Sequence, residues 1–146
     1  MGYSSRITRR CCVVLDTNVL LLLADGVNIF EQIDEILFTK CEYIILSQVL
    51  RELEKIAGSK RNVERRKARY VLSLLREFKD KYNIKILSIN DKGYPVDDIL
   101  VETALALNCY IASNDKALRS KARRKNIPEI YYREEKGMLE ASKEFI

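Results

Sequence analysis

Four carboxylates in this sequence follow short apolar segments in a repeated way. Asp16 and Asp115 each come directly after such a segment, while Glu52 and Asp97 lie in the first or second turn of a helix expected after one. The segments have the length and the β-branched content of strands buried on both faces. Because ligands bind at the carboxyl ends of strands in open α/β sheets, we expect all four acids to converge at one edge.

Carboxylates held close together cannot all ionise without a counter-charge, and a divalent cation would supply it. The sequence contains no histidine, which excludes Ser-His-Asp and Cys-His catalysis and any histidine general base. Oxygen ligands without His or Cys favour Mg²⁺ or Mn²⁺. A water bound to such an ion can attack a phosphodiester once its pKa falls. The acids therefore predict a metal-dependent hydrolytic site.

Helical spacing supports an inward position for two of these acids. Asp97 shares its helix face with the apolar residues at the i+3, i+4 and i+7 positions, and Glu52 lies on the margin of an apolar stripe. Simpler roles remain open. Asp115 opens a helix and could be an N-cap, and Asp98 could be an acid that favours the positive end of its helix.

The rest of the sequence alternates strand and helix patterns, which predicts a parallel α/β sheet in one domain, 1–146. Ser47 is expected as an N-cap and Pro95 as a first-turn residue. The acidic tail after residue 132 is expected to form a last short helix or to fray. We expect strands at residues 11–15, 43–46, 84–87, 110–113 and 130–132, and helices at 17–24, 27–39, 47–57, 63–82, 95–107 and 115–125.

Composition indicates a globular protein, since 47% of the 146 residues are hydrophobic and 32% are charged. The longest apolar run, residues 19–24, is far shorter than the roughly 20 residues that span a bilayer. No signal peptide is evident, so we expect a cytoplasmic protein without a membrane segment. The net charge of +5 permits a polyanionic partner without demanding one.

The four cysteines, Cys11, Cys12, Cys41 and Cys109, form no CxxC pair. Without clustered Cys and His a structural zinc site is not expected, so we interpret the cysteines as small buried apolar residues in strands. Cys11 and Cys12 are adjacent on a strand and point to opposite faces, so both cannot serve one site.

Four motifs together resemble the PIN-domain ribonucleases: VVLDTN (13–18), LRELEKI (50–56), VDDILVETAL (96–105) and IASNDKAL (111–118). The resemblance covers nearly the whole chain, and DTN and SND are its most specific parts. It implies a three-layer α/β/α fold with a central, mostly parallel sheet of four to five strands. It also implies an endoribonuclease that uses Mg²⁺ or Mn²⁺. By motif position, Asp16, Glu52, Asp97 and Asp115 match the catalytic and metal-binding acids.

The same motifs suggest supporting residues and a biological context. Asn18 and Ser113 match the family's supporting polar positions, and Ser113 keeps the hydroxyl of the usual Thr. Asp98 beside Asp97 is similar to the paired acids of PIN proteins of ribosomal RNA processing, while the chain also resembles small archaeal PIN proteins, some named VapC-type toxins. The resemblance makes an antitoxin or a ribosome-assembly protein a possible partner, and a homodimer plausible.

Two groups of basic residues could contact RNA phosphates, which would position RNA without reading its sequence. A solvated helix face is the alternative for each. A non-catalytic PIN-like module that binds RNA or a ribosome-assembly partner is the alternative to the enzyme. A receiver-like phosphoryl-transfer domain is disfavoured, because neither a DxD pattern nor a strand-end Lys is found. The two groups of basic residues that could contact RNA phosphates are Lys60, Arg61, Arg65, Arg66, Lys67 and Arg69, and Arg119, Lys121, Arg123, Arg124 and Lys125.

Overall fold

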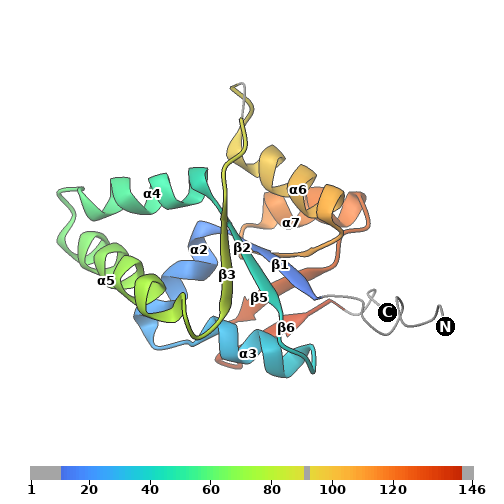
Figure 1. The fold of residues 1–146 in the computed structure, drawn as a ribbon, viewed down its shortest axis with the longest axis horizontal. Coiled ribbons are helices and arrows are strands. Elements are labelled where there is room, and N and C mark those ends of the chain that lie inside the picture. The colour runs from blue at the N-terminus through green and yellow to red at the C-terminus, as the bar shows by residue number, and fades with distance from the viewer. Residues whose placement is uncertain (1–10, 91–92, 143–146) are drawn as a thin grey trace.

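A single six-stranded sheet runs through the computed structural model, which describes residues 11–90 and 93–142. Its strand order is β3-β2-β1-β4-β5-β6, which places β1 near the middle (Figure 1). The strands are β1 (Cys12–Leu15), β2 (Glu42–Leu46), β3 (Asn83–Leu87), β4 (Tyr110–Ala112), β5 (Glu129–Arg133) and β6 (Met138–Ala141).

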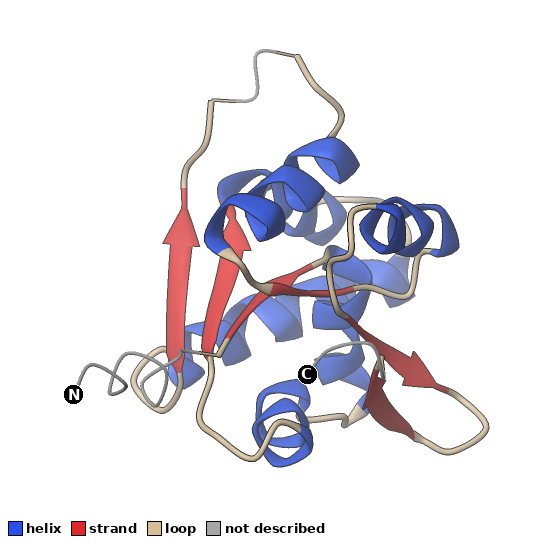
Figure 2. Cartoon of the chain, turned by 90° about the vertical axis from the view of Figure 1, so that its right-hand side faces the viewer, coloured by secondary structure: helices blue, strands red, loops and turns tan. Residues whose placement is uncertain are grey.

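Helices pack on both faces of this sheet, so the predicted three-layer α/β/α class is confirmed (Figures 1 and 2). In Figure 1, α4 and α5 lie on one side and α6 and α7 on the other. The helices are α2 (Thr17–Leu20), the 3-10 helix η1 (Leu21–Asp25), α3 (Ile29–Ile36), α4 (Ser47–Ala57), α5 (Asn62–Phe78), α6 (Val96–Leu107) and α7 (Lys116–Arg124).

The first five strands pair in parallel, as expected, whereas β5 and β6 pair antiparallel. The sheet thus has one strand more than the upper prediction. The expected helix or frayed tail is wrong for residues 138–141, because they form β6. Gly137 takes a left-handed conformation (φ 66°) that closes the β5–β6 hairpin, and Leu139 of β6 is buried.

Two predicted helix starts shift by one residue. Ser47 is the first residue of α4 and Leu46 is its N-cap, with no side-chain capping bond. Pro95 is the N-cap of α6 rather than a first-turn residue. α4 still begins directly after β2, and α6 is the next helix after β3, so a shift of one residue in each helix start leaves Glu52 and Asp97 in the predicted helices.

The core is built around β1, whose four residues are all buried. Large apolar side chains from both neighbouring layers, such as Leu53 of α4 and Leu100 of α6, are fully buried against the sheet. Burial of a side chain of this size contributes roughly 1.5–3 kcal/mol. The consequence for function is that the carboxyl end of β1 is held on all sides.

The cysteines were expected to be small buried residues, and Cys12, Cys41 and Cys109 are buried. They are not simple apolar residues, however, because the structure contains two disulfides, Cys11–Cys41 and Cys12–Cys109. The strand register explains both. Cys12 lies opposite Glu42, which puts Cys11 next to Cys41, and Val13 lies opposite Tyr110, which puts Cys12 next to Cys109. The Cα–Cα distances of 4.7 and 4.8 Å are those of adjacent strand neighbours.

Over residues 11–90 and 93–142, no helix is both long and apolar enough to cross a membrane.

Candidate active site

Asp16 stands at the carboxyl end of β1 and is almost completely buried, with 8% of its surface exposed. Its backbone N–H donates to the Ala112 carbonyl at 3.0 Å, which ties it to β4. Its carboxylate caps α2 by accepting the Thr17 N–H at 2.8 Å on Oδ1. On Oδ2 it accepts the Ser113 hydroxyl at 2.7 Å and the Asn18 side-chain amide at 3.2 Å. The predicted supporting residues therefore both contact this carboxylate.

Asn114, which sequence reasoning missed, extends this network from Asn18 to Tyr132 on the neighbouring strand β5. Its backbone N–H donates to Asn18 Oδ1 at 3.0 Å, and its own Oδ1 accepts the Tyr132 N–H at 2.8 Å. Asn18 is thus held from both ends, between Asp16 and Asn114. The signal was available in the sequence, since Asn114 is the middle residue of the SND motif.

Thr17 contributes more to the site than its expected role, which was to start the helix after Asp16. Its buried hydroxyl donates to Glu52 Oε1 at 2.7 Å. Glu52 is exposed on α4, and this hydrogen bond ties it to Thr17, the residue next to Asp16. Within the DTN motif, Thr17 thus contacts two acids: its N–H bonds Asp16, and its hydroxyl bonds Glu52 on α4.

Asp97 and Asp98, both in the first turn of α6, have different surroundings. Asp98 Oδ1 accepts a hydrogen bond from Lys121 of α7 at 2.9 Å, in a half-exposed ion pair. Asp97 is half-buried and faces Asp115, Asp98 and Glu52 electrostatically. The two adjacent acids are therefore not equivalent, because only Asp98 has a cation as a direct partner.

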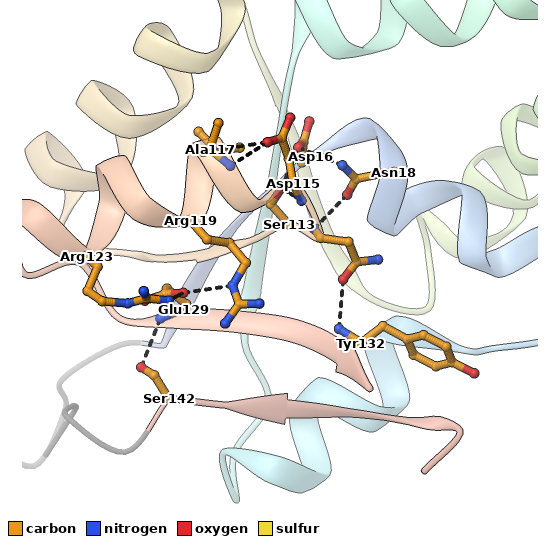
Figure 3. A network of polar contacts seen from close by, with 12 residues as sticks. Asp16, Asn18, Ser113, Asp115, Ala117, Arg119, Arg123, Glu129, Tyr132 and Ser142 are labelled. Carbon is orange, nitrogen blue, oxygen red and sulfur yellow. Dashed lines mark hydrogen bonds and ion pairs between the residues drawn. The ribbon is translucent and has the colours of Figure 1, made fainter. Parts of the chain in front are cut away.

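Asp115 is exposed and caps α7, as the simpler interpretation predicted. Its Oδ1 accepts the N–H groups of Ala117 and Leu118 at 2.8 and 3.2 Å. Its own N–H donates to Ser113 Oγ at 3.0 Å. Ser113 therefore connects Asp16 and Asp115, and Figure 3 shows the two acids close together at this end of the sheet. Asp115 therefore both caps α7 and belongs to the acidic group.

Among the four predicted acids, Asp16 and Asp97 are the most buried, and their pKa values reflect the crowding of the group. Burial raises the pKa of Asp16, the hydrogen bonds from Ser113 and Thr17 oppose the rise, and the charges of Asp97 and Glu52 add to it. Burial also raises the pKa of Asp97, with further contributions from Asp115, Asp98 and Glu52 and an opposing one from Lys121. The structure thus brings all four predicted acids within electrostatic reach of one another.

The donor chemistry of this group fits a hard divalent cation, because every candidate ligand is a carboxylate oxygen and the negative charge is incompletely balanced. The arrangement is open, however. Within the described part of the chain, no three acidic or cysteine side chains are placed closely enough to hold an ion. Asp115 and Glu52 are exposed and Asp97 is half-buried, so these three side chains are less tightly packed than that of Asp16.

Most of the basic residues predicted to contact RNA are paired within the molecule. Arg119 donates from Nε to Glu129 at 2.8 Å and stacks on Tyr131, with its guanidinium carbon 3.8 Å from the ring centre. Its guanidinium thus has a structural role, and the predicted RNA contact has no support from this geometry. Lys67 pairs with Asp25, Arg61 with Glu64, Lys121 with Asp98, Arg123 with Glu129 and Lys125 with Glu102, while Arg65 bonds Asn62 and Arg69 the Ala57 carbonyl.

Comparison with known proteins agrees with this fold. The family model described as "PIN like domain" matches residues 13–135, and the chain belongs to this family. The chain is 34% identical over 129 residues to Ribonuclease VapC9 of Archaeoglobus fulgidus, covering 88% of this chain and 87% of that protein. It is 31% identical over 125 residues to Ribonuclease VapC4 of Methanocaldococcus jannaschii, covering 85% and 92%.

A eukaryotic relative and a solved structure point to the same family. The chain is 34% identical over 114 residues to the rRNA-processing protein FCF1 of Saccharomyces cerevisiae, covering 77% of this chain and 54% of that protein. The PIN domain endonuclease Utp24 superposes with a TM-score of 0.68 at 28% identity, covering 90% of each chain. The similar proteins thus include both ribonucleases named VapC and a protein of ribosomal RNA processing.

Proposed function

We propose that this protein is a metal-dependent endoribonuclease that hydrolyses RNA phosphodiester bonds at the acidic edge of its sheet, within a single nuclease domain spanning 1–146. The observation that carries the proposal is the burial of Asp16 among hydrogen-bond donors beside three further acids. Hydrogen bonds from Ser113 and Thr17 lower the pKa of Asp16, but burial and the charges of Asp97 and Glu52 raise it, so the negative charge of the group is not balanced by its own contacts.

In this proposal Asp16, Asp97 and Asp115 would hold Mg²⁺ or Mn²⁺, directly or through water, with Glu52 as a water-mediated ligand or as the residue that orients the nucleophile. The ion would supply a water of lowered pKa and would balance charge on the phosphate. Ser113, Asn18 and Thr17 hold Asp16 in one rotamer, so its oxygens need no reorganisation when substrate arrives. Asp98 is a supporting residue whose charge is partly compensated by Lys121.

RNA is the proposed substrate because curated relatives are named ribonucleases and an rRNA-processing protein. An antitoxin or a ribosome-assembly protein is the corresponding protein partner, and a homodimer and a cytoplasmic location stay predictions. The alternative, a non-catalytic PIN-like RNA-binding module, would tolerate loss of the acids. All four acids are present, which favours the enzyme.

Cleavage of fluorescently labelled, structured RNA in Mn²⁺ or Mg²⁺ tests the proposal. We expect fragments with the wild type, none in EDTA, and a loss of at least about 100-fold in rate with Asp97→Asn. Asp97→Asn is preferred over a change at Asp16 because the described contacts give the Asp97 carboxylate no hydrogen bond, while the Asp16 carboxylate accepts three. RNA that stays intact with every metal, or is cut equally by the variant, contradicts the enzyme.

A further inference from the structure

We propose that RNA approaches the acidic site along α4, where Arg51, Lys55 and Lys60 contact its phosphates. These three residues are named the α4 cation strip. The inference rests on the proposed function and adds to it the surface that receives the substrate. Sequence patterning favoured the other basic groups, and of this strip it included only Lys60.

The ion pairs around α7 argue against this helix as the surface that binds RNA. Four of its cations face acids of the same molecule: Arg119 and Arg123 pair with the buried Glu129, Lys121 with Asp98 and Lys125 with Glu102. An RNA phosphate there would have to displace a carboxylate or sit close to one. Lys116 and Arg124 are the exposed α7 cations for which the described contacts show no partner.

The start of α5 is compensated in a similar way. Lys67 bonds Asp25 at 3.0 Å, Arg61 lies 3.8 Å from Glu64, and Arg65 and Arg69 donate to neutral oxygen atoms. Arg66 is exposed without a described partner and lies one turn from the exposed Tyr70. Arg66 and Arg76 are the exposed α5 cations without a described partner, and they lie ten residues apart near opposite ends of the helix, whereas the α4 cation strip groups three within ten residues beside Glu52.

Each member of the α4 cation strip is exposed, and the described contacts give none of them a hydrogen bond or ion pair. Arg51 directly precedes Glu52, and Lys55 follows it by three residues. With a rise of about 1.5 Å per residue, both lie within about 5 Å of Glu52 along the helix axis. Lys60 continues the strip in the turn after α4.

The direction of α4 gives the strip its geometry. The helix begins where β2 ends, at the carboxyl edge of the sheet, and runs outward from there (Figure 1). Glu52 is linked to Thr17 beside Asp16. The strip therefore starts at the acidic site and leads away from it, which suits a strand of RNA whose scissile phosphate lies at the acids and whose neighbouring phosphates extend along α4.

Unpaired surface cations suit RNA phosphates in energy as well as position. They are not committed to a carboxylate, so binding does not first have to break an ion pair. Each neutralised phosphate releases counterions, so the affinity for single-stranded nucleic acid falls as salt concentration rises. The slope of the logarithm of the binding constant against the logarithm of the salt concentration is about −0.7 per contact. Three strip contacts would contribute roughly −2 to that slope.

The test measures binding of a fluorescently labelled single-stranded RNA oligonucleotide by anisotropy in EDTA, over a range of salt concentrations. The strip variant carries Arg51→Ala, Lys55→Ala and Lys60→Ala. The matched control carries Lys40→Ala, Lys79→Ala and Lys81→Ala, which removes the same charge from exposed residues. Lys40 and Lys81 lie beside the amino-terminal ends of β2 and β3, and Lys79 is the C-cap of α5, just before β3. Neither variant alters an acid of the site.

We expect the strip variant to bind at least about 10-fold more weakly, with a salt slope shallower by about 2, and the control to bind within about 2-fold of the wild type. Equal affinity of strip variant and wild type, or equal loss in both variants, overturns the inference. Cleavage is measured separately in Mn²⁺. RNA that binds through the strip and stays uncut contradicts the proposed function alone, while cleavage with unchanged binding by the strip variant contradicts this inference alone.

Discussion

The Thr17 hydroxyl donates a 2.7 Å hydrogen bond to Glu52 and so joins the first residue of α2 to the middle of α4, 35 positions later in the sequence. Thr17 is buried and Glu52 is exposed, so the bond restrains an otherwise mobile carboxylate from its buried side. Glu52 can then point toward Asp16 instead of into solvent.

Removing this hydroxyl should reduce catalysis more than stability. Thr17→Val keeps the side-chain shape, and we expect cleavage in Mn²⁺ to fall by about 10-fold, as for other groups that orient ligands. Thr17→Ser keeps the donor and should retain most of the activity. A drop in both variants would point to packing rather than to the hydrogen bond, and thermal melting of each variant checks the fold.

Asp97→Asn should stabilise the metal-free protein at neutral pH. The pKa of Asp97 is raised in the folded state, so its ionisation costs folding free energy. The cost is absent below the unfolded pKa, grows as pH rises through the folded pKa and stays constant above it. We therefore expect a higher melting temperature than the wild type at pH 7 in EDTA, and no gain near pH 3.

Asp98→Asn provides the comparison, since it removes a charge that is paired with Lys121. It should leave the melting temperature at pH 7 unchanged or lower it. An increase as large as that of Asp97→Asn would mean that overall negative charge, not the crowding at Asp97, sets the effect.

Mn²⁺ or Mg²⁺ should raise the melting temperature of the wild type by binding only the folded state. At a metal concentration of 100 times the dissociation constant, linkage gives about 2.7 kcal/mol of stabilisation. Because protons compete for the raised-pKa carboxylates, this gain should shrink as pH falls. Calorimetry with and without metal measures it, and an equal gain in Asp97→Asn would place the ion elsewhere.

Glu129→Gln should destabilise the fold without a direct effect on the acids. Glu129 is 3% exposed and receives Arg119 and Arg123. The change weakens charge-assisted hydrogen bonds from Arg119 and Arg123, whose own side chains stay partly exposed to water, so we expect the free energy of unfolding to fall by about 2 kcal/mol. Glu102→Gln, in an exposed pair with Lys125, should cost under about 1 kcal/mol in the same denaturant titration.

Sequence reasoning located the acids and the strands because both follow local rules. Asp16 ends a short buried strand, and Asp97 falls on an apolar helix face; both signals lie within a few residues. Two hydrogen bonds could not be predicted in the same way: the bond between Thr17 and Glu52, and the bond between Asn18 and Asn114. They join residues 35 and 96 positions apart, and their pairing depends on how α2, α4 and β4 meet.

The other differences between the predictions and the structure also involve residues that are distant in the sequence. A basic helix looks alike in sequence whether it is free or paired, so the ion pairs of Arg119 and its neighbours in α7 became visible only with Glu129 in place. β6 was missed because a four-residue strand next to acidic residues has a weak pattern, and the Gly137 turn decides the hairpin. The disulfides required the register of β1 with both of its neighbours.

The disulfides also determine what happens when the backbone is cut. Cys12 and Cys109 are 97 positions apart, so the covalent ring that they close contains β2, β3 and α2 to α6. A protease that cleaves any single peptide bond between them, for example in the loop between β3 and α6, leaves two pieces still joined through the bridge. Such a nicked molecule would run as one chain on a non-reducing gel and separate only after reduction, with β1 and Asp16 on one piece and Ser113 and Asp115 on the other.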